Sequence, residues 1–454
     1  MPKKILLISA NRHRAPYPIY PIGLSYLSTY LKKELEDYDV LTFDMNFGTL
    51  EELGALIDAQ QPGYIGLSLR NIDGANSFDR TGFVEGYESI TRQIRRHSRS
   101  PLILGGAGFS VYAPTLFNLL QPDFAIKGEG EKALVELLTA LDGNAGYEHI
   151  EGLLYKNKEG AVVFNRRREF ARKLSVDFDD RLIDYYWEHS GMLNIQTKRG
   201  CYYKCIYCSY PLIEGVCVRC LDSDEIVENL EKLSKEKGID YVFFTDSIFN
   251  IKNDYNVALA EKIIRKNLRI RWAAYFSPSN ISNEEMALYK RSGLSHIEFG
   301  TESFSDTQLA NYGKRFTFDT VLKTSELALK HNVFYAHFLI LGGYGETEKT
   351  LEETFENAKK LRYTVMFPFV GMRIYPGTML QQHAIREGVI SENDTLLEPA
   401  YYISKNFDPA TLKERARATG KAWIFADDVQ NEEIERFRMK RKKKGLIWEY
   451  LRLP

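Results

Sequence analysis

The stretch Arg199-Gly-Cys201-Tyr-Tyr-Lys-Cys205-Ile-Tyr-Cys208 is the most informative part of this sequence of 454 residues. It places three cysteines at spacings of four and three in a short loop directly after a predicted strand at residues 193–197. Three thiolates leave a cubane iron–sulfur cluster one iron short of full thiolate ligation, and that open iron can bind a substrate. A structural zinc site normally has four ligands, often as two separated pairs. Cys217 and Cys220 form a second pair that could supply further ligands, so zinc remains an alternative.

Strands and helices alternate on the C-terminal side of this loop. Six strands with intervening helices predict a partial parallel (β/α)6 barrel over residues 186–400, with its chemistry at the carboxyl ends of the strands. The predicted strands cover residues 193–197, 241–245, 270–275, 296–299, 334–341 and 365–372, and the helices cover residues 223–237, 257–266, 283–292, 318–331 and 348–362. After residue 401 the periodicity weakens, and we expect a helical extension over residues 401–454 with a basic run at residues 436–444.

The N-terminal part of the chain shows the same alternation and predicts a doubly wound parallel sheet over residues 1–145. Predicted strands lie at residues 4–9, 38–43, 64–69, 101–105 and 123–127, and helices lie at residues 24–36, 50–60 and 87–97. Glycines follow two of these strands, at the edge where such sheets bind ligands. A hairpin is expected at residues 150–164 and an arginine-rich linker at residues 165–181, so residues 146–185 connect the two domains.

Composition narrows the class of protein. The net charge is -1, from 60 Lys plus Arg against 61 Asp plus Glu, so no global field attracts nucleic acid. No apolar run reaches the ~18 residues that a membrane-spanning helix needs. All five cysteines lie between Cys201 and Cys220, which does not fit a secreted disulfide scaffold. We therefore expect a cytoplasmic enzyme with no membrane span and no nucleic-acid partner.

The cysteine loop, with Tyr207 directly before its last cysteine, resembles that of the radical S-adenosylmethionine superfamily. The resemblance implies that Cys201, Cys205 and Cys208 hold a 4Fe-4S cluster whose open iron is chelated by S-adenosylmethionine. It also implies that an electron donor such as flavodoxin or ferredoxin reduces the cluster. Reduction cleaves a carbon–sulfur bond and usually produces a 5'-deoxyadenosyl radical.

Three later segments resemble the cobalamin-binding branch of that superfamily. They are Ile297-Glu-Phe-Gly-Thr-Glu302-Ser, Leu339-Ile-Leu-Gly-Gly-Tyr-Gly-Glu346-Thr and Ile374-Tyr-Pro-Gly-Thr378. The Gly-Gly-Glu element usual after the second barrel strand is missing, and Thr245-Asp246 stands in its place. The resemblance implies that S-adenosylmethionine is contacted by Tyr207, Asp246, Ser277 and Glu302.

The N-terminal loops extend this resemblance to nearly the whole chain. Gly105-Gly-Ala-Gly-Phe-Ser110 and Lys127-Gly-Glu-Gly-Glu131 match the glycine-rich loops on which the corrin ring of cobalamin rests in that branch. The implied cobalamin-binding residues are Ser68, Asn71, Gly105, Gly106, Glu129 and Gly130. If the ring rests on this loop, a side chain at Gly106 projects into its space, so that Gly106→Val removes corrinoid binding and leaves the cluster intact. If these glycines only permit close helix–strand packing, the substitution destabilises the N-terminal domain as a whole.

Two further patterns limit this interpretation. No Asp-x-His-x-x-Gly is present, so the chain offers no histidine as a lower axial ligand, and a cobalamin fold without cobalamin remains an alternative. Gly106-Ala-Gly108 lacks the third glycine of a dinucleotide-binding loop and follows a late strand, which argues against a dinucleotide site.

The resemblance implies methyl transfer to an unactivated carbon of a small-molecule substrate. One alternative is a cobalamin-independent radical enzyme that transfers a 3-amino-3-carboxypropyl group, as in arsinothricin-type biosynthesis. Cys217 and Cys220 would then be catalytic, because a dithiol near the cluster can capture a thiophilic atom. A second alternative is a non-catalytic corrinoid-binding or zinc-binding protein.

Overall fold

The computed structural model describes residues 3–14, 16–78, 80–171, 173–405, 407–425, 444–446 and 448. The N-terminal sheet has seven strands in the order β2-β1-β3-β4-β5-β6-β7. Strands β1 to β5 are parallel, and β6 and β7 return antiparallel as a hairpin. The strands are β1 (Lys3–Ser9), β2 (Tyr38–Asp44), β3 (Tyr64–Ser68), β4 (Leu102–Gly105), β5 (Phe124–Ile126), β6 (Leu153–Lys156) and β7 (Val162–Phe164).

Helices cover both faces of this sheet, because its parallel strands are apolar on both sides. One face packs on α1 (Ile22–Glu34) and α6 (Glu131–Asp142), and the other on α2 (Leu50–Gln60), α3 (Val84–His97) and α5 (Ala113–Leu120). The short α4 (Ala107–Val111) lies between β4 and α5. The predicted doubly wound α/β fold is confirmed, and the hairpin prediction is also correct.

The second sheet also has seven strands, in the order β18-β15-β14-β13-β12-β11-β8, and every pair in it is parallel. Its strands are β8 (Leu193–Ile195), β11 (Tyr241–Phe244), β12 (Arg271–Phe276), β13 (Leu294–Glu302), β14 (Phe334–Leu341), β15 (Val365–Val370) and β18 (Ala422–Trp423). The helices between them are α9 (Ser223–Lys237), α10 (Asn253–Arg265), α11 (Asn283–Arg291), α12 (Asp306–Asn311), α13 (Phe318–Lys330) and α14 (Glu348–Ala358). β8 and β18 are not paired with each other, so the barrel is open as predicted.

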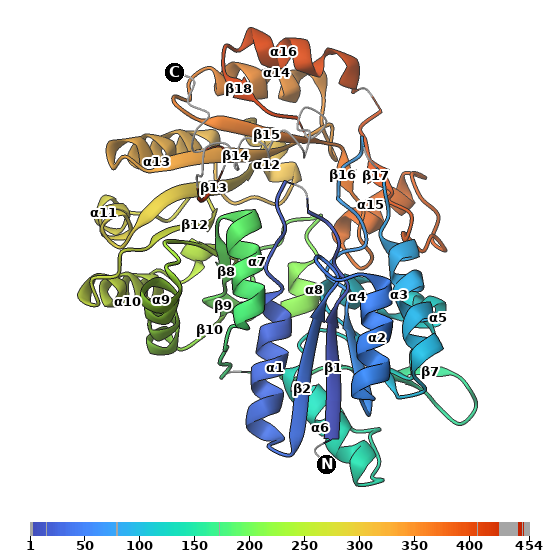
Figure 1. The fold of residues 1–454 in the computed structure, drawn as a ribbon. Coiled ribbons are helices and arrows are strands. Elements are labelled where there is room, and N and C mark those ends of the chain that lie inside the picture. Colours follow the sequence, from blue (N-terminus) through green and yellow to red (C-terminus); the bar gives the residue numbers. More distant parts are fainter. Residues whose placement is uncertain are drawn as a thin grey trace.

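Shorter elements connect these layers. They are α7 (Asp180–Ser190), β9 (Lys198–Arg199), α8 (Tyr210–Glu214), β10 (Arg219–Cys220), η1 (Phe249–Ile251), β16 (Met372–Arg373), α15 (Met379–Arg386), β17 (Tyr401–Tyr402), η2 (Pro409–Thr411) and α16 (Leu412–Ala418). Figure 1 shows the second sheet curving from green β8 to orange β15 beside the blue N-terminal sheet, with α8 at the junction. Within the described part of the chain, no helix has both the length and the apolar composition needed to cross a membrane.

Two predictions about connecting segments need correction. The C-terminal extension is only partly helical, because β18 adds an edge strand beside β15. Residues 426–443, 447 and 449–454, which include most of the predicted basic run, lie outside the described residues. The predicted linker is packed, since Leu174 and Val176 are buried in the core of the barrel domain together with Tyr26 of α1. The proposed domain boundaries themselves stay a prediction.

Candidate functional site

The cysteine loop begins directly after β9. Gly200 has a φ of +90°, a conformation that favours glycine, and a Cβ there would lie 2.2 Å from the carbonyl oxygen of Cys217. The amide of Cys201 donates to the carbonyl oxygen of Gly215 at 3.1 Å, and that of Cys208 donates to the carbonyl oxygen of Cys205 at 3.2 Å. The loop therefore folds back closely on the segment that follows α8, which fixes where its thiols lie.

The three thiols are neighbours in a partly buried environment. Burial raises the pKa of Cys208 to about 12, and the charges of Cys205 and Cys201 add to that rise. Burial likewise raises the pKa of Cys201, with Cys205 contributing. Thiols in such a place ionise when a metal compensates their charge. Among the residues that the structure describes, no three His, Cys, Asp or Glu side chains converge closely enough to hold one metal ion. A cubane cluster fits this wider arrangement, because each thiolate binds a different iron.

Tyr207 and Glu302 lie together beside this loop. The hydroxyl of Tyr207 donates to Oε1 of Glu302 at 2.6 Å, and Nζ of Lys314 pairs with the same oxygen at 3.2 Å. Burial raises the pKa of Tyr207 well above its usual value, and the carboxylate of Glu302 adds to the rise, so the phenol remains a hydrogen-bond donor. The structure thus brings together two of the residues assigned to S-adenosylmethionine. Their contact with that molecule remains a prediction.

Asp246 follows β11, as the sequence predicts. Its side chain is fully buried and pairs with Nζ of Lys198 at 2.6 Å. Its Oδ1 accepts from the amides of Thr197 at 2.7 Å and Lys198 at 3.0 Å. The carboxylate is therefore committed to holding the chain between β8 and the cysteine loop. The structure shows a positioning role for Asp246, and its contact with S-adenosylmethionine stays a prediction.

Ser277 follows β12 and is also buried. Its amide donates to Oδ1 of Asn250 at 2.9 Å, and its hydroxyl shares a hydrogen bond of 2.9 Å with Ser279. The same hydroxyl hydrogen-bonds to Tyr203 of the cysteine loop. Ser277 therefore lies beside the predicted cluster, and its contact with S-adenosylmethionine stays a prediction.

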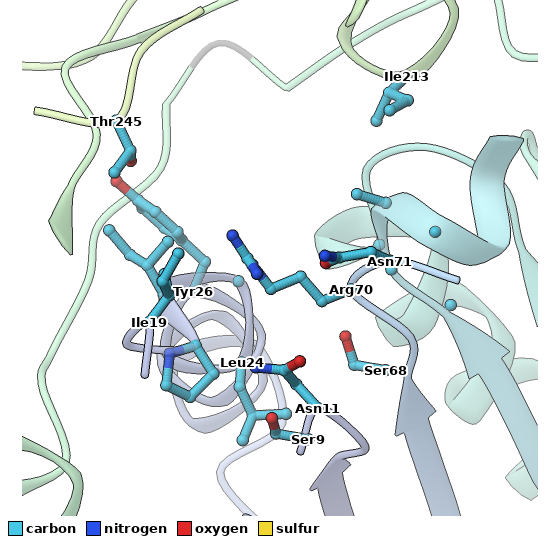
Figure 2. A pocket seen from close by; sticks show the side chains of 18 of the residues that line it. Ser9, Asn11, Ile19, Leu24, Tyr26, Ser68, Arg70, Asn71, Ile213 and Thr245 are labelled. Atoms are coloured by element: carbon cyan, nitrogen blue, oxygen red, sulfur yellow. The ribbon is translucent and has the colours of Figure 1, made fainter. Parts of the chain in front are cut away.

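A cavity of about 620 Å³ lies between the two domains. It reaches from the carboxyl edge of the N-terminal sheet to the mouth of the barrel and to α8 (Figure 2). Its lining includes Ser68, Asn71, Gly105, Gly106 and Gly130 from the first domain, Asn194, Gln196, Thr245 and Tyr275 from the barrel, and Ser209, Tyr210 and Ile213 next to the cysteines. Tyr210 and Tyr275 both line the cavity and are 41% and 39% exposed.

The backbone of the cavity wall leaves room for a large flat ligand. At Gly23 and Gly74, which both line the cavity, a Cβ would meet no atom within 4 Å. Figure 2 shows the side chain of Arg70 extending into the open space from the loop that carries Ser68 and Asn71. No histidine or cysteine occurs among the described residues that line it. The cavity therefore fits a corrin ring without a protein imidazole as its lower ligand.

Glu129 differs from the other residues assigned to cobalamin. Its Oε1 pairs with Arg219 at 2.7 Å and with Arg199 at 3.4 Å, and its Oε2 accepts from the amide of Ala171 at 2.9 Å. Oε1 of Glu131 pairs with Arg199 at 2.8 Å. Burial alone would lower the pKa of the Arg199 guanidinium, but these carboxylates raise it. The Glu129 side chain therefore joins the two domains. Glu129 also lines the cavity, and its contact with cobalamin stays a prediction.

Of the two expectations for Gly106, the surroundings of this residue favour close packing of the backbone. This residue has a φ of +95°, and a Cβ there would lie 2.5 Å from the carbonyl oxygen of Leu69 and 2.9 Å from Oγ of Ser68. A side chain at Gly106 would thus collide with the neighbouring loop before it reached any ligand. Substitution should destabilise the N-terminal domain as well as change the cavity.

Cys217 and Cys220 do not line the cavity. Cys217 is exposed, and Cys220 lies on β10, where it pairs with Lys198 on β9. Nothing in this arrangement supports the catalytic role that was predicted for the two thiols.

The sequence patterns missed a second connection between the domains. Arg373 on β16 pairs with Asp73, in the loop after β3, at 2.8 Å and donates to the hydroxyl of Tyr112 at 2.9 Å. Asp73 and Arg373 are 300 positions apart. No local signal in the sequence could have joined them.

The chain was compared with known proteins. Residues 195–358 match the radical SAM superfamily, and residues 8–138 match the B12 binding domain. The chain combines a B12 binding domain with a radical SAM domain. The two matched segments contain the cysteine loop with most of the barrel, and the sheet with its glycine-rich loops.

The relatives of this radical SAM protein include methyltransferases. It is 24% identical over 440 residues to tryptophan 2-C-methyltransferase of Streptomyces laurentii, covering 82% of this chain and 73% of the relative. It is 25% identical to an uncharacterized methyltransferase of Pyrococcus horikoshii, covering 95% of this chain and 94% of the relative. It shares its fold with the radical S-adenosylmethionine methyltransferase TsrM from Kitasatospora setae, solved with cobalamin and a [4Fe-4S] cluster bound. The TM-score is 0.81 at 23% identity, with 92% and 88% of the two chains covered. The chain is thus a radical SAM methyltransferase-like enzyme.

Proposed function

We propose that this enzyme transfers the methyl group of S-adenosylmethionine, by way of cobalamin, to a carbon atom of a small-molecule substrate. The observation that carries the proposal is the single cavity that touches both the N-terminal loops and the residues next to Cys208. A corrin ring held by the first set would face a cluster held by the second without a protein wall between them. The tryptophan methyltransferase among the relatives supports the reaction class and leaves the substrate of this chain open.

The residues of this chain would share the work as follows. Cys201, Cys205 and Cys208 hold the cluster, while Ser68, Asn71 and the glycine-rich backbone support the corrin ring. When bound, the cluster supplies a low-potential electron, S-adenosylmethionine supplies the methyl group, and cobalamin carries it. Apolar and aromatic side chains at the barrel mouth exclude water from the reacting atoms. The electron itself has to come from an external one-electron donor.

Product analysis tests the proposal under anaerobic conditions. Full-length protein is reconstituted with iron and sulfide, reduced, and supplied with S-adenosylmethionine with or without hydroxocobalamin. We expect S-adenosylhomocysteine to form only when cobalamin is present, since methyl transfer leaves that product. Methylthioadenosine formed without cobalamin would contradict the proposal, because it is left when the 3-amino-3-carboxypropyl group is transferred.

Two cysteine variants control this experiment. Cys205→Ala should abolish iron binding and every reaction of S-adenosylmethionine that needs the cluster. Cys217→Ala makes the same chemical change on an exposed residue that does not line the cavity. It should retain iron and product formation at wild-type levels.

A further inference from the structure

A buried lysine lies beside the cysteine loop. Lys314 follows α12, and only 8% of its side chain is exposed. Its Nζ donates to the carbonyl oxygen of Gly300 at 3.1 Å, pairs with Glu302 at 3.2 Å and lies 5.6 Å from the centre of the Tyr207 ring. The backbone before it is fixed to the loop, since a Cβ at Gly313 would lie 2.6 Å from the carbonyl oxygen of Lys204. The position of this ammonium relative to the cysteines is therefore well defined.

Its partner Glu302 has an unusual backbone. The residue has a φ of +70° and lies where the register between β13 and β14 shifts. A non-glycine residue rarely adopts such a conformation, which persists where the surroundings impose it. A buried ion pair adds little to stability, because desolvation offsets the attraction. Strain and a buried ion pair at one position suggest a role other than stability.

The charges around Lys314 include the cluster ligands. Burial alone would lower the pKa of its ammonium, but the charges of Glu302, Cys205 and Cys208 raise it above its ordinary value. Lys314 thus keeps its positive charge and acts electrostatically on two of the three thiolates. Glu302 places a negative charge on the same side, within hydrogen-bond distance of both Tyr207 and Lys314.

We propose that Lys314 and Glu302 set the reduction potential of the cluster, Lys314 raising it and Glu302 lowering it. The inference rests on the proposed function only in assuming that the three cysteines hold a cluster. Reduction adds one negative charge to the cluster, and a nearby cation stabilises that charge while an anion opposes it. In a partly buried site such charges act more strongly than in water. Because the two residues have opposite charges, removing each one should shift the potential in opposite directions.

A redox titration followed by electron paramagnetic resonance tests this pair. It uses the reconstituted full-length protein without S-adenosylmethionine, as wild type, Lys314→Met and Glu302→Gln. At the wild-type midpoint, the ratio of reduced to oxidised cluster should fall about tenfold in Lys314→Met and rise about tenfold in Glu302→Gln. Tenfold corresponds to ~59 mV for one electron.

Two further variants serve as controls. Lys314→Arg keeps the positive charge, so its ratio of reduced to oxidised cluster should stay within about twofold of wild type. A larger change would mean that the site needs lysine itself and not only a positive charge. Lys349→Met removes an exposed lysine from α14 and should also leave the ratio unchanged.

If the reduction potential shifted in the same direction in Lys314→Met and Glu302→Gln, the proposal would be overturned. Such a result would mean that both substitutions act through a looser structure or the entry of water and not through the charge removed. Ratios within about twofold of wild type in both would also overturn it. If Lys314→Met fails to retain iron, the sign of the Glu302→Gln shift decides. A wild-type chain that forms no cluster would instead refute the proposed function, so the two failures are distinguishable.

Discussion

The loops that follow β4 and β5 have similar sequences, but the structure uses them differently. In the first, Gly106 and Gly108 allow the backbone to pack against Leu69 and Asn71 in the loop after β3. This packing supports the segment that carries Ser68, Arg70 and Asn71 into the cavity. In the second loop, Glu129 and Glu131 extend away from their own sheet to Arg199 and Arg219. Both loops line the cavity, but only the second loop also attaches the barrel through its ion pairs.

The difference shows how little a glycine-rich motif says by itself. Glycines in both loops bring backbones close together, but only the neighbouring side chains decide what is held there. Arg199 lies two residues before Cys201, so the second loop fixes the position of the cluster relative to the N-terminal sheet. The proposed corrin site and the cluster are thus positioned by the loops after β4 and β5, which are adjacent in one sheet.

The largest expected effect comes from removing a thiol. Cys201→Ala, Cys205→Ala or Cys208→Ala should each abolish cluster binding, because a cubane held by two thiolates exposes two irons and becomes labile. Corrinoid binding should persist in all three, since the first loop is untouched. Iron analysis and a cobalamin titration of the same samples measure both. Simultaneous loss of corrinoid binding would show that the two loops do not act separately.

Removing the ion pairs between the loop after β5 and Arg199 should have the next largest effect, this time on stability. Arg199→Met removes the ion-pair partner of the buried Glu131 carboxylate, while Glu129 keeps its pair with Arg219. Breaking a buried pair in this way costs about 3–5 kcal/mol. Urea unfolding measures the loss of stability. Arg271→Met is a matched control, because its pair with Asp240 is 3.5 Å long and exposed, and such pairs contribute at most about 1 kcal/mol. Equal losses in the two variants would contradict the assigned role of the second loop.

Glycine substitutions in the cavity wall sharpen the comparison. Gly106→Ala should cost about 1–3 kcal/mol or more, because its φ is positive and its Cβ meets backbone. Gly23→Ala should leave stability unchanged or raise it by up to about 1 kcal/mol, since Gly23 lies in α1 and its Cβ meets open space. Its corrinoid affinity should still fall if the ring lies against this backbone. Thermal unfolding measures the stability of each variant, and a cobalamin titration measures its corrinoid affinity. A destabilised Gly23→Ala would contradict the interpretation that this part of the cavity wall faces open space.

The smallest expected effect is at Ser68. Ser68→Ala removes one hydroxyl from the cavity wall, and one hydrogen bond contributes about 0.5–1.5 kcal/mol. The dissociation constant for cobalamin should therefore rise about two- to tenfold while the unfolding transition stays in place. An unchanged dissociation constant would mean that this hydroxyl does not touch the ligand.

Local patterns were sufficient to predict most of the fold. The predicted helices at residues 50–60 and 223–237 have the bounds of α2 and α9, because amphipathic periodicity is a local property. β18 escaped prediction because two residues carry no alternation, and only the neighbouring β15 makes them a strand. The parallel barrel strands were found because each is an apolar run between helices.

The site was predictable only where a motif defines it. The cysteine spacing identifies a cluster loop without knowledge of its neighbours. For Asp246 and Glu129 the sequence did not reveal the ion pairs that the structure shows, because a polar residue after a strand can bind a cofactor or hold a neighbouring segment. The partners of these two carboxylates, Lys198 and Arg199, are far away in sequence. Lys314 gave no signal at all, since its role depends on contacts made after folding.

The central claim is that one cavity serves both a corrin ring and the cluster. It is tested most directly by measuring cobalamin and iron on the same anaerobically reconstituted chain after gel filtration. We predict one corrinoid and about four irons per chain. Four irons with no corrinoid retained at any concentration would contradict the account, because the cavity would then hold something other than cobalamin.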